Sequence, residues 1–184
     1  LEVLRTTPKI SMANVKIIKY QDYMKDLSPP LAVNTVRLEP LQGTSLVIID
    51  PAVVFASLDN FFGGFGRGMN ALPPGRSFTP TETSIIGIML NVFFGALQEA
   101  WAPVMPIKCE HVSSEVNPAF AQIADGNDLV IVSRFESELS HDVKGNIDLV
   151  YPYSSLKPIR EALASRVQTG DDDTGDQKWS TELH

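Results

Sequence analysis

The residues with the clearest potential for chemistry form a glycine-rich segment, Phe61-Phe62-Gly63-Gly64-Phe65-Gly66-Arg67-Gly68. Such a loop binds phosphate when a strand precedes it and a helix follows, because backbone N–H groups then converge on the anion. Here a helix comes first. Asp50-Pro51 is typical of a helix start, and Val54, Leu58 and Phe61 recur at helical spacing. This order, with no Gly-Lys-Ser/Thr after it, argues against a nucleotide loop.

Two explanations remain for these glycines, which follow a helix predicted over about residues 51–62. A single glycine commonly ends a helix in the left-handed conformation, and Gly63 is placed for that role. Four glycines within six residues are more than a helix stop needs, and a backbone without side chains lets another molecule approach closely. The segment is therefore either a flexible helix stop or a binding loop.

Other chemistry finds little support in the sequence. The three histidines, His111, His141 and His184, are not paired at ligand spacing, and the one cysteine, Cys109, has no partner motif. Asp171-Asp172-Asp173 lacks the ligand spacing of a calcium loop, and there is no Gly-x-Ser-x-Gly nucleophile elbow. We expect no metal, no cofactor and no catalytic residue. Cys109 is expected to be a small buried residue, and His111 a surface or half-buried one.

Further blocks along the chain define a family resemblance together with the glycine segment. In collinear order over essentially the whole chain, they resemble the middle domain of the flagellar motor switch protein FliM. The blocks are Asp59–Arg67, Arg76-Ser77-Phe78-Thr79-Pro80-Thr81-Glu82, Glu99-Ala100-Trp101, Ser114-Glu115-Val116-Asn117 and Pro152–Glu161.

This resemblance implies a non-enzymatic subunit of the flagellar rotor ring, the C-ring, which couples chemotaxis signalling to the direction of rotation. The ring lies in the cytoplasm, at the cytoplasmic face of the inner membrane in the basal body. The Gly-Gly-X-Gly loop of the family binds FliG, which assigns FliG binding here to Gly63, Gly64, Phe65, Gly66 and Arg67. Phe65 stands at the variable position of that loop, and it either points outward as an anchor or folds back onto the helix.

The resemblance implies further partners. Neighbouring FliM subunits lie side by side in the ring. Phosphorylated CheY binds mainly through an amino-terminal peptide of the family, and FliN binds through a carboxy-terminal domain. Neither region is present in this sequence, so we expect an excised fragment. The tail at Asp176-Gln177-Lys178-Trp179 is similar to the start of the helix that leads to that carboxy-terminal domain.

An enzymatic alternative comes from the CheC-type phosphatases, whose fold resembles that of FliM. They act on phosphorylated CheY through a helical Glu-x-x-Asn pair, in which the asparagine orients the attacking water. No glutamate in this chain has asparagine three residues later. Asn91, on a predicted long helix, is preceded by Gly87 and Ile88 at the relevant spacings. The phosphatase therefore remains only the alternative to a binding function.

Composition agrees with a globular protein of ordinary domain size. The chain has 184 residues, 43% of them hydrophobic, and a net charge of −7. No basic stripe of the kind that nucleic acid requires is present. The single cysteine fits a reducing compartment. Acidic residues are concentrated at the end of the chain. Residues 171–184 contain five acidic residues and one lysine, Lys178; the acidic ones are Asp171, Asp172, Asp173, Asp176 and Glu182. This composition is typical of a solvated linker.

An internal repeat organises the chain. Alternating residues over 33–39 are followed by Gly43, the apolar run Leu46–Ile49 and the helix from Pro51. The pattern recurs over 130–136, Gly145, Ile147–Tyr151 and a helix from about Ser155. Gly43 and Gly145 are 102 residues apart, as are Asp50 and Pro152. Arg37-Leu38-Glu39 and Arg134-Phe135-Glu136 are 97 apart, which predicts a second hairpin turn five residues longer.

We therefore predict an α/β (α+β) fold: a three-layer α/β/α, CheC-like domain with pseudo-twofold symmetry and a mainly antiparallel sheet. The domain is predicted over residues 1–168, with pseudo-repeats at about 9–62 and 104–168 and an acidic linker at 169–184. Each repeat begins with another candidate strand, Val15–Tyr20 or Ile107–Val112.

A long helix at 80–101 joins the predicted repeats, and Thr79-Pro80-Thr81-Glu82 supplies its capping box. Its apolar stretch, Ile85–Leu97, is shorter than the roughly 20 residues of a membrane span. We expect a helix buried on most sides, with a seam of small or polar residues where another backbone can approach. The seam consists of Ser84, Gly87, Asn91, Gly95 and Gln98.

Overall fold

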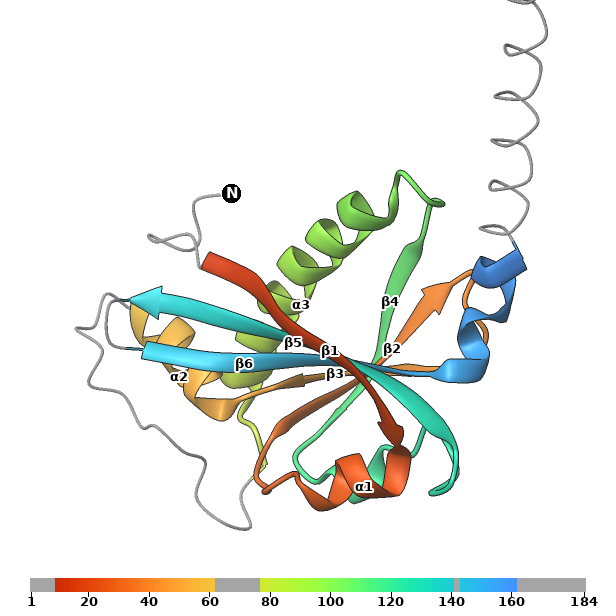
Figure 1. Cartoon of the computed structure of the whole chain (residues 1–184). Helices are drawn as coiled ribbons and strands as arrows, with labels where there is room; N and C mark the ends of the chain where they lie inside the picture. Colours follow the sequence, from red (N-terminus) through yellow and green to blue (C-terminus); the bar gives the residue numbers. More distant parts are fainter. Residues whose placement is uncertain (1–8, 62–76, 141–142, 162–184) are drawn as a thin grey trace, which may run out of the picture.

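The computed structural model describes residues 9–61, 77–140 and 143–161. Its centre is a six-stranded antiparallel sheet with the order β1-β5-β6-β3-β2-β4 (Figure 1). The strands are β1 Lys9–Lys19, β2 Ala32–Glu39, β3 Ser45–Ile49, β4 Lys108–Glu115, β5 Leu129–Ser140 and β6 Val143–Pro152. The helices are α1 Tyr20–Lys25, α2 Pro51–Phe61 and α3 Pro80–Trp101, with 3-10 turns at Pro118–Phe120 (η1) and Tyr153–Leu156 (η2).

Helices cover both faces of this sheet, because successive side chains of a strand point to opposite faces. On one face, Val47, Ile49, Ile147 and Leu149 pack in a large core with residues of α2 and α3. On the other face, Leu46, Ile48, Val130, Val132 and Val150 pack in a smaller core with two tyrosines of α1 and the segment after η1. The predicted three layers are present, and the second helical layer is thin.

The sheet confirms the predicted pseudo-twofold symmetry. Exchanging β1 with β4, β2 with β5 and β3 with β6 turns the strand order into its own reverse. At the centre Val47 pairs with Leu149, and these residues are 102 apart. Their neighbours Leu46↔Val150 and Ile48↔Asp148 exchange under the same offset. The axis therefore passes between β3 and β6, and the runs 46–49 and 147–151 belong to equivalent strands, as the repeat predicts.

Strand register corrects one detail of the predicted repeat. Ile131 pairs with Tyr151 where Ala32 pairs with Ile49, so β2 and β5 are related by 99 residues and not by 97. The same 99 relates β1 to β4, where the sheet has bulges at the equivalent residues Ala13 and Val112. The second hairpin connection is thus three residues longer, not five. The predicted and observed offsets differ by two residues, so each side chain stays on the same face of the sheet. The alternation of apolar and polar residues therefore cannot distinguish the two offsets.

Helix starts follow the predicted capping chemistry. The Asp50 side chain accepts a hydrogen bond from the N–H of Ala52 at 3.0 Å at the start of α2. At α3, Thr79 Oγ1 accepts from the N–H of Glu82 (3.2 Å), and Glu82 Oε2 accepts from the N–H of Thr79 (2.8 Å). These two bonds form the predicted capping box.

The other element bounds differ modestly from the prediction. β1 begins earlier and β4 ends later than expected, and neither α1 nor η1 was predicted. The last helix starts after the 3-10 turn η2, and helical residues continue from Lys157 to the end of the described part. The predicted domain limit at residue 168 and the linker 169–184 lie outside the described residues.

Helix α3 corrects the expectation of a helix buried on most sides. Its 22 residues are long and apolar enough to cross a membrane by length and composition, which is weak evidence because core helices pass the same test. One side is buried through Ile85, Ile86, Leu90, Phe93, Phe94 and Leu97. The predicted seam is largely open: Ser84, Asn91 and Gly95 are exposed, and a Cβ added at Gly87 or Gly95 would meet no atom within 4 Å.

Candidate functional site

The predicted FliG-binding residues lie outside the described residues, so the orientation of Phe65 is untested; these residues are Gly63, Gly64, Phe65, Gly66 and Arg67. The structure does describe the two helices that this segment joins. α2 ends at Phe61 and α3 begins at Pro80. Both helices contribute to the large core, α2 through Val53 and Val54 and α3 through Ile86 and Leu90. The segment is therefore attached to rigid elements at both ends.

The first turn of α2 is held by strand β6. The N–H of Asp50 donates to the carbonyl of Asn146 at 3.0 Å. Val53 is wholly buried against Gly145, where a Cβ would overlap Val53 Cγ2. The sequence prediction missed this contact and used Gly145 only to mark the repeat. A glycine inside a strand, which often marks a close backbone approach, was the available signal.

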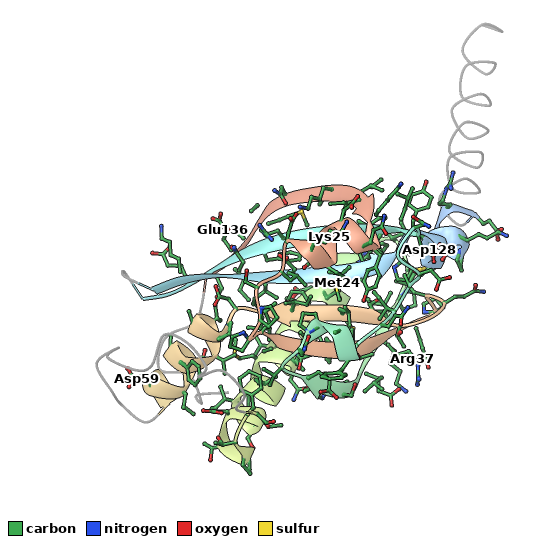
Figure 2. All side chains as sticks on the ribbon, turned by 90° about the horizontal axis from the view of Figure 1, so that it is seen from below. Met24, Lys25, Arg37, Asp59, Asp128 and Glu136 are labelled. Atoms are coloured by element: carbon green, nitrogen blue, oxygen red, sulfur yellow. The ribbon has the colours of Figure 1, made fainter. Side chains whose placement is uncertain are left out.

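Near the far end of α2, Asp59 has an unusual environment (Figure 2). Its Oδ2 atom is buried and accepts no hydrogen bond from any residue that the structure describes. Buried carboxylate oxygens are normally hydrogen-bonded, and negative charge near a helix C-terminus is opposed by the helix dipole. Asp59 is four residues before Gly63 in the sequence. A buried carboxylate oxygen with no donor in the described part of the chain therefore lies shortly before the candidate binding segment.

A histidine and a serine lie close together at β4, but in an arrangement that does not activate the serine. Asn34 is fully buried and donates its Nδ2 hydrogens to the carbonyls of Ala32 and Val47, which leaves its Oδ1 to accept from Ser114 Oγ at 2.7 Å. His111 Nε2 lies 2.8 Å from the same Oγ. The Ser114 proton points to Asn34, so His111 must donate and does not act as a base toward Ser114.

The groove beside this cluster borders the beginning of α3. It has a volume of about 680 Å³. Its lining includes Phe78 and Thr83 from the α3 end, His111 and Ser114 from β4, and Phe120 from η1. The Phe120 side chain is 76% exposed at its rim. The groove offers an aromatic contact for a partner.

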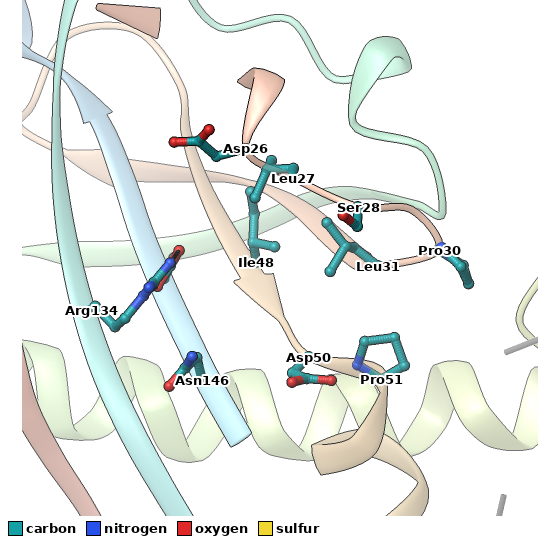
Figure 3. A pocket seen from close by; sticks show the side chains of 11 residues that line it. Asp26, Leu27, Ser28, Pro30, Leu31, Ile48, Asp50, Pro51, Arg134 and Asn146 are labelled. Atoms are coloured by element: carbon teal, nitrogen blue, oxygen red, sulfur yellow. Dashed lines mark hydrogen bonds and ion pairs between the residues drawn. The ribbon is translucent and has the colours of Figure 1, made fainter. Parts of the chain in front are cut away.

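Arg134 and Asp148 line a pocket of about 380 Å³ (Figure 3), and together with Tyr23 they form a closed polar cluster. Arg134 donates to both carboxylate oxygens of Asp148, at 2.9 and 3.0 Å, and Tyr23 donates to Oδ2 at 2.7 Å. Burial, and then the charge of Asp148, raise the pKa of Tyr23 well above its usual value. The hydrogen bond to Asp148 raises the pKa of Arg134. All three groups are matched, so the cluster stabilises the sheet and leaves no group poised for proton transfer.

An apolar groove of about 400 Å³ lies between edge strand β1 and the C-terminal half of α3. Met12 and Val15 of β1 stand at one side, and Ala96 and Trp101 of α3 at the other. Met12, Val15 and Ile17 are each more than half exposed. Met12 and Val15 thus contribute exposed apolar side chains to the groove.

Catalytic and metal sites find no support in the described part of the chain. No group of three or more potential metal ligands occurs there. Of the glutamates on α3, Glu82 forms the capping box and Glu99 is exposed near the C-terminal end. Asn91 is exposed with no carboxylate one turn before it. Cys109 is half-buried, not fully buried as expected; burial raises its pKa, against a hydrogen bond with Gln98 that lowers it.

Comparison with known proteins gives consistent matches over most of the chain. The family model described as flagellar motor switch protein FliM matches residues 1–168. FliM of Pseudomonas aeruginosa is 40% identical over 177 residues, covering 96% of this chain and 54% of that protein. FliM of Escherichia coli is 34% identical, covering 89% of this chain and 48% of that protein. The chain thus spans about half the length of the curated relatives it matches.

Solved structures agree with this similarity. The FliM middle domain of Vibrio alginolyticus has a TM-score of 0.75 and 38% identity, and 88% of each chain is covered. The FliG–FliM complex of Helicobacter pylori gives a TM-score of 0.76 and 25% identity, covering 86% of this chain and 85% of that one. FliY of Thermotoga maritima shares the fold alone, with a TM-score of 0.64 and 19% identity.

Proposed function

Because the chain belongs to the FliM family of flagellar motor switch proteins, we propose that it is a non-enzymatic subunit of the flagellar rotor ring that binds FliG. Gly63, Gly64, Phe65, Gly66 and Arg67 form the binding segment. The match over residues 1–168 is the observation that supports this proposal most strongly. The similarity to a FliM chain solved together with FliG points the same way.

The other proposed partners follow from the same family membership. Neighbouring copies of the protein lie beside one another in the ring, in the cytoplasm at the inner face of the membrane. FliN and phosphorylated CheY bind through regions outside this sequence, so the described domain couples to them through the ring. Chemotaxis signals then reach FliG and set the direction of rotation.

A binding role also agrees with the chemistry of the described residues. The Ser114 proton points away from His111, and Arg134, Asp148 and Tyr23 satisfy one another. Asn91 lacks the carboxylate that a CheC-type phosphatase places one turn earlier. We therefore expect the protein to leave the dephosphorylation rate of phosphorylated CheY unchanged, and a clear acceleration in that assay would contradict the proposal.

FliG affinity measured by calorimetry tests the binding segment directly. Gly64→Val should weaken binding by constraining the backbone, while its melting temperature stays close to that of the parent. Phe65→Ala should cost about 1–2 kcal/mol of binding free energy if the ring is an interface anchor, and almost nothing if it is not. Unchanged affinity in Gly64→Val would mean that the segment is only a helix stop and that FliG binds elsewhere.

A further inference from the structure

Gly145 in β6 leaves a space that a side chain of α2 fills. Gly145 pairs with Ser137 of β5 and is buried. A Cβ at this position would overlap Val53 Cγ2, while Val53 Cβ would be 3.5 Å away and Asp50 Cβ 3.6 Å away. The last two distances are ordinary contacts. The conflict therefore lies between one added methyl and one methyl of Val53.

The neighbouring residue of β6 attaches the same helical turn. The carbonyl of Asn146 accepts the N–H of Asp50 at 3.0 Å, and the Asp50 side chain caps the N–H of Ala52 at 3.0 Å. Two consecutive residues of one strand thus place the start of α2, Gly145 by lacking a side chain and Asn146 by a hydrogen bond. Val53 itself is 0% exposed, so it has no solvent side into which to move.

The contact at the start of α2 also affects where the other end of this helix lies. Eight residues separate Val53 from Phe61, which is about 12 Å at 1.5 Å per residue. A rigid helix moved at its first turn transmits that movement to its last turn, because packed cores absorb little volume. The residues after Phe61 lead directly to the proposed FliG-binding segment.

Among the described residues, the glycine that the repeat relates to Gly145 lacks this contact. Gly43 is related to Gly145 by the 102-residue repeat, yet a Cβ at Gly43 would have no atom within 4 Å. Gly43 is glycine for a different reason, its positive φ of 80°. The close contact with Gly145 is therefore specific to α2, the helix that precedes the glycine-rich segment in the sequence. The fold itself does not require it.

We propose that Gly145 is a positioning residue for partner binding: its missing side chain admits Val53 and thereby sets the direction of α2, the helix that precedes the proposed FliG-binding residues 63–67 in the sequence. This inference rests on the proposed function. It concerns orientation, so it makes a prediction that a purely structural role for Gly145 does not make.

Four variants test it by FliG affinity and melting temperature. Gly145→Ala should weaken FliG binding at least fivefold. Val53→Ala should leave affinity within about twofold, because it opens space without displacing α2. The double variant Gly145→Ala/Val53→Ala should return affinity to within about twofold of the parent. Gly87→Ala is the matched control; it adds a methyl where no atom lies within 4 Å and should not change binding.

The double variant separates orientation from stability. If it recovers the melting temperature but not the affinity, or if Gly145→Ala binds as tightly as the parent, the proposal is wrong. Should Gly145→Ala alone not fold, the comparison of the double variant with Val53→Ala decides: equal affinity supports the rescue, and a fivefold loss contradicts it.

Amide NMR distinguishes a failure of this inference from a failure of the proposed function. The amide resonances of Gly63, Gly64, Gly66 and Gly68 should shift in Gly145→Ala and return in the double variant, while those of β2 and β4 stay in place. This result needs no FliG. If Gly64→Val retains FliG affinity but the glycine resonances respond as expected, the positioning is supported and the binding assignment is wrong. Unmoved glycine resonances would overturn the positioning itself.

Discussion

In the first half of the sheet Leu46 fills a fully buried position beside the pseudo-twofold axis, whereas its equivalent in the second half is Asp148, which holds Arg134 and Tyr23. Thr35 of the first half likewise corresponds to Arg134. The backbone pairing is the same in both halves. An apolar side chain and a closed ion pair are therefore alternative ways to complete one scaffold position.

The two edges of the sheet differ in the same manner. With the 99-residue offset, Ile10, Met12, Val15 and Ile17 of β1 correspond to Cys109, His111, Ser114 and Val116. One edge has an open apolar surface, and the other a hydrogen-bonded polar chain with an exposed phenylalanine nearby. Both edges keep the bulge, which re-aims the strand and discourages edge pairing. The repeat thus preserves backbone geometry while each half acquires its own surface.

The largest expected effect comes from breaking the polar cluster. Asp148→Ala leaves Arg134 and the Tyr23 hydroxyl without their acceptor, and it should lower the free energy of unfolding by about 3 kcal/mol in urea denaturation. Giving the second half the residues of the first, with Arg134→Thr and Asp148→Leu, and removing the unpartnered hydroxyl with Tyr23→Phe should together recover most of that loss. If the triple variant is no more stable than Asp148→Ala, the two halves are not interchangeable at this position.

The two repeat-related glycines should respond differently to alanine. Gly145→Ala forces a methyl into a filled space and should destabilise the fold by about 1–3 kcal/mol. Gly43→Ala meets no neighbour but must adopt a positive φ, which costs about 1–2 kcal/mol. Adding Val53→Ala should relieve the first variant and leave the second unchanged. Thermal and urea unfolding of the four proteins provide the measurement, and equal responses to Val53→Ala would refute the distinction.

Alkaline pH should lower the free energy of unfolding through Tyr23 of the polar cluster. The pKa of the Tyr23 hydroxyl is raised in the folded protein by burial and by Asp148, so the unfolded chain, with a tyrosine pKa of about 10, loses that proton first. Stability from this group is complete below about pH 10 and falls as pH rises above it, by up to about 1.4 kcal/mol per pH unit. Burial raises the pKa values of Tyr20 and Tyr151 in the same direction.

Unfolding measured between pH 8 and 11 tests this linkage, with Tyr23→Phe as the comparison. The variant lacks the ionisable hydroxyl and should show a shallower loss of stability above pH 10. Identical slopes for the parent and Tyr23→Phe would show that Tyr23 does not contribute to the alkaline transition.

The smallest effects should come from the sheet edges. Val15→Thr and Val112→Thr replace exposed valines, at 54% and 47% exposure, and should each change the free energy of unfolding by less than about 0.5 kcal/mol. Their association should differ, because Val15 lines the apolar groove while Val112 does not. Sedimentation velocity should show less self-association for Val15→Thr than for Val112→Thr, and the reverse order would contradict the contrast between the edges.

Much of the fold could be predicted because its signals are local. The capping box at Thr79 and Glu82, the helix start at Asp50, and the alternation in β2 and β5 each depend on residues close together in sequence. Strand register could not be predicted to better than two residues, since every second side chain faces the same way. Helix α1 is only six residues long, and its two buried tyrosines are covered by other parts of the fold. It is too short to give a periodic pattern in the sequence.

The candidate site was less accessible to the same reasoning. The glycine-rich segment stands out by composition, and the family resemblance attached a partner to it. The contact between Gly145 and Val53 joins residues that are 92 positions apart, and the surroundings of the Asp59 carboxylate are equally a matter of packing. The solvent side of α3 was also misjudged, because an apolar helix has no sequence mark that says how much of it a sheet will cover.

The amino-acid sequence by itself determined the helix starts, the antiparallel strands, the 102-residue repeat and the family to which the chain belongs, since these rest on spacing, capping chemistry and collinear motifs. Only the tertiary structure decided the 99-residue register, the matched trio of Arg134, Asp148 and Tyr23, and the seating of α2 on β6. Those features depend on which side chains meet across the sheet. These side-chain contacts follow from the packing of the whole chain, in which a single methyl group can determine the position of a helix.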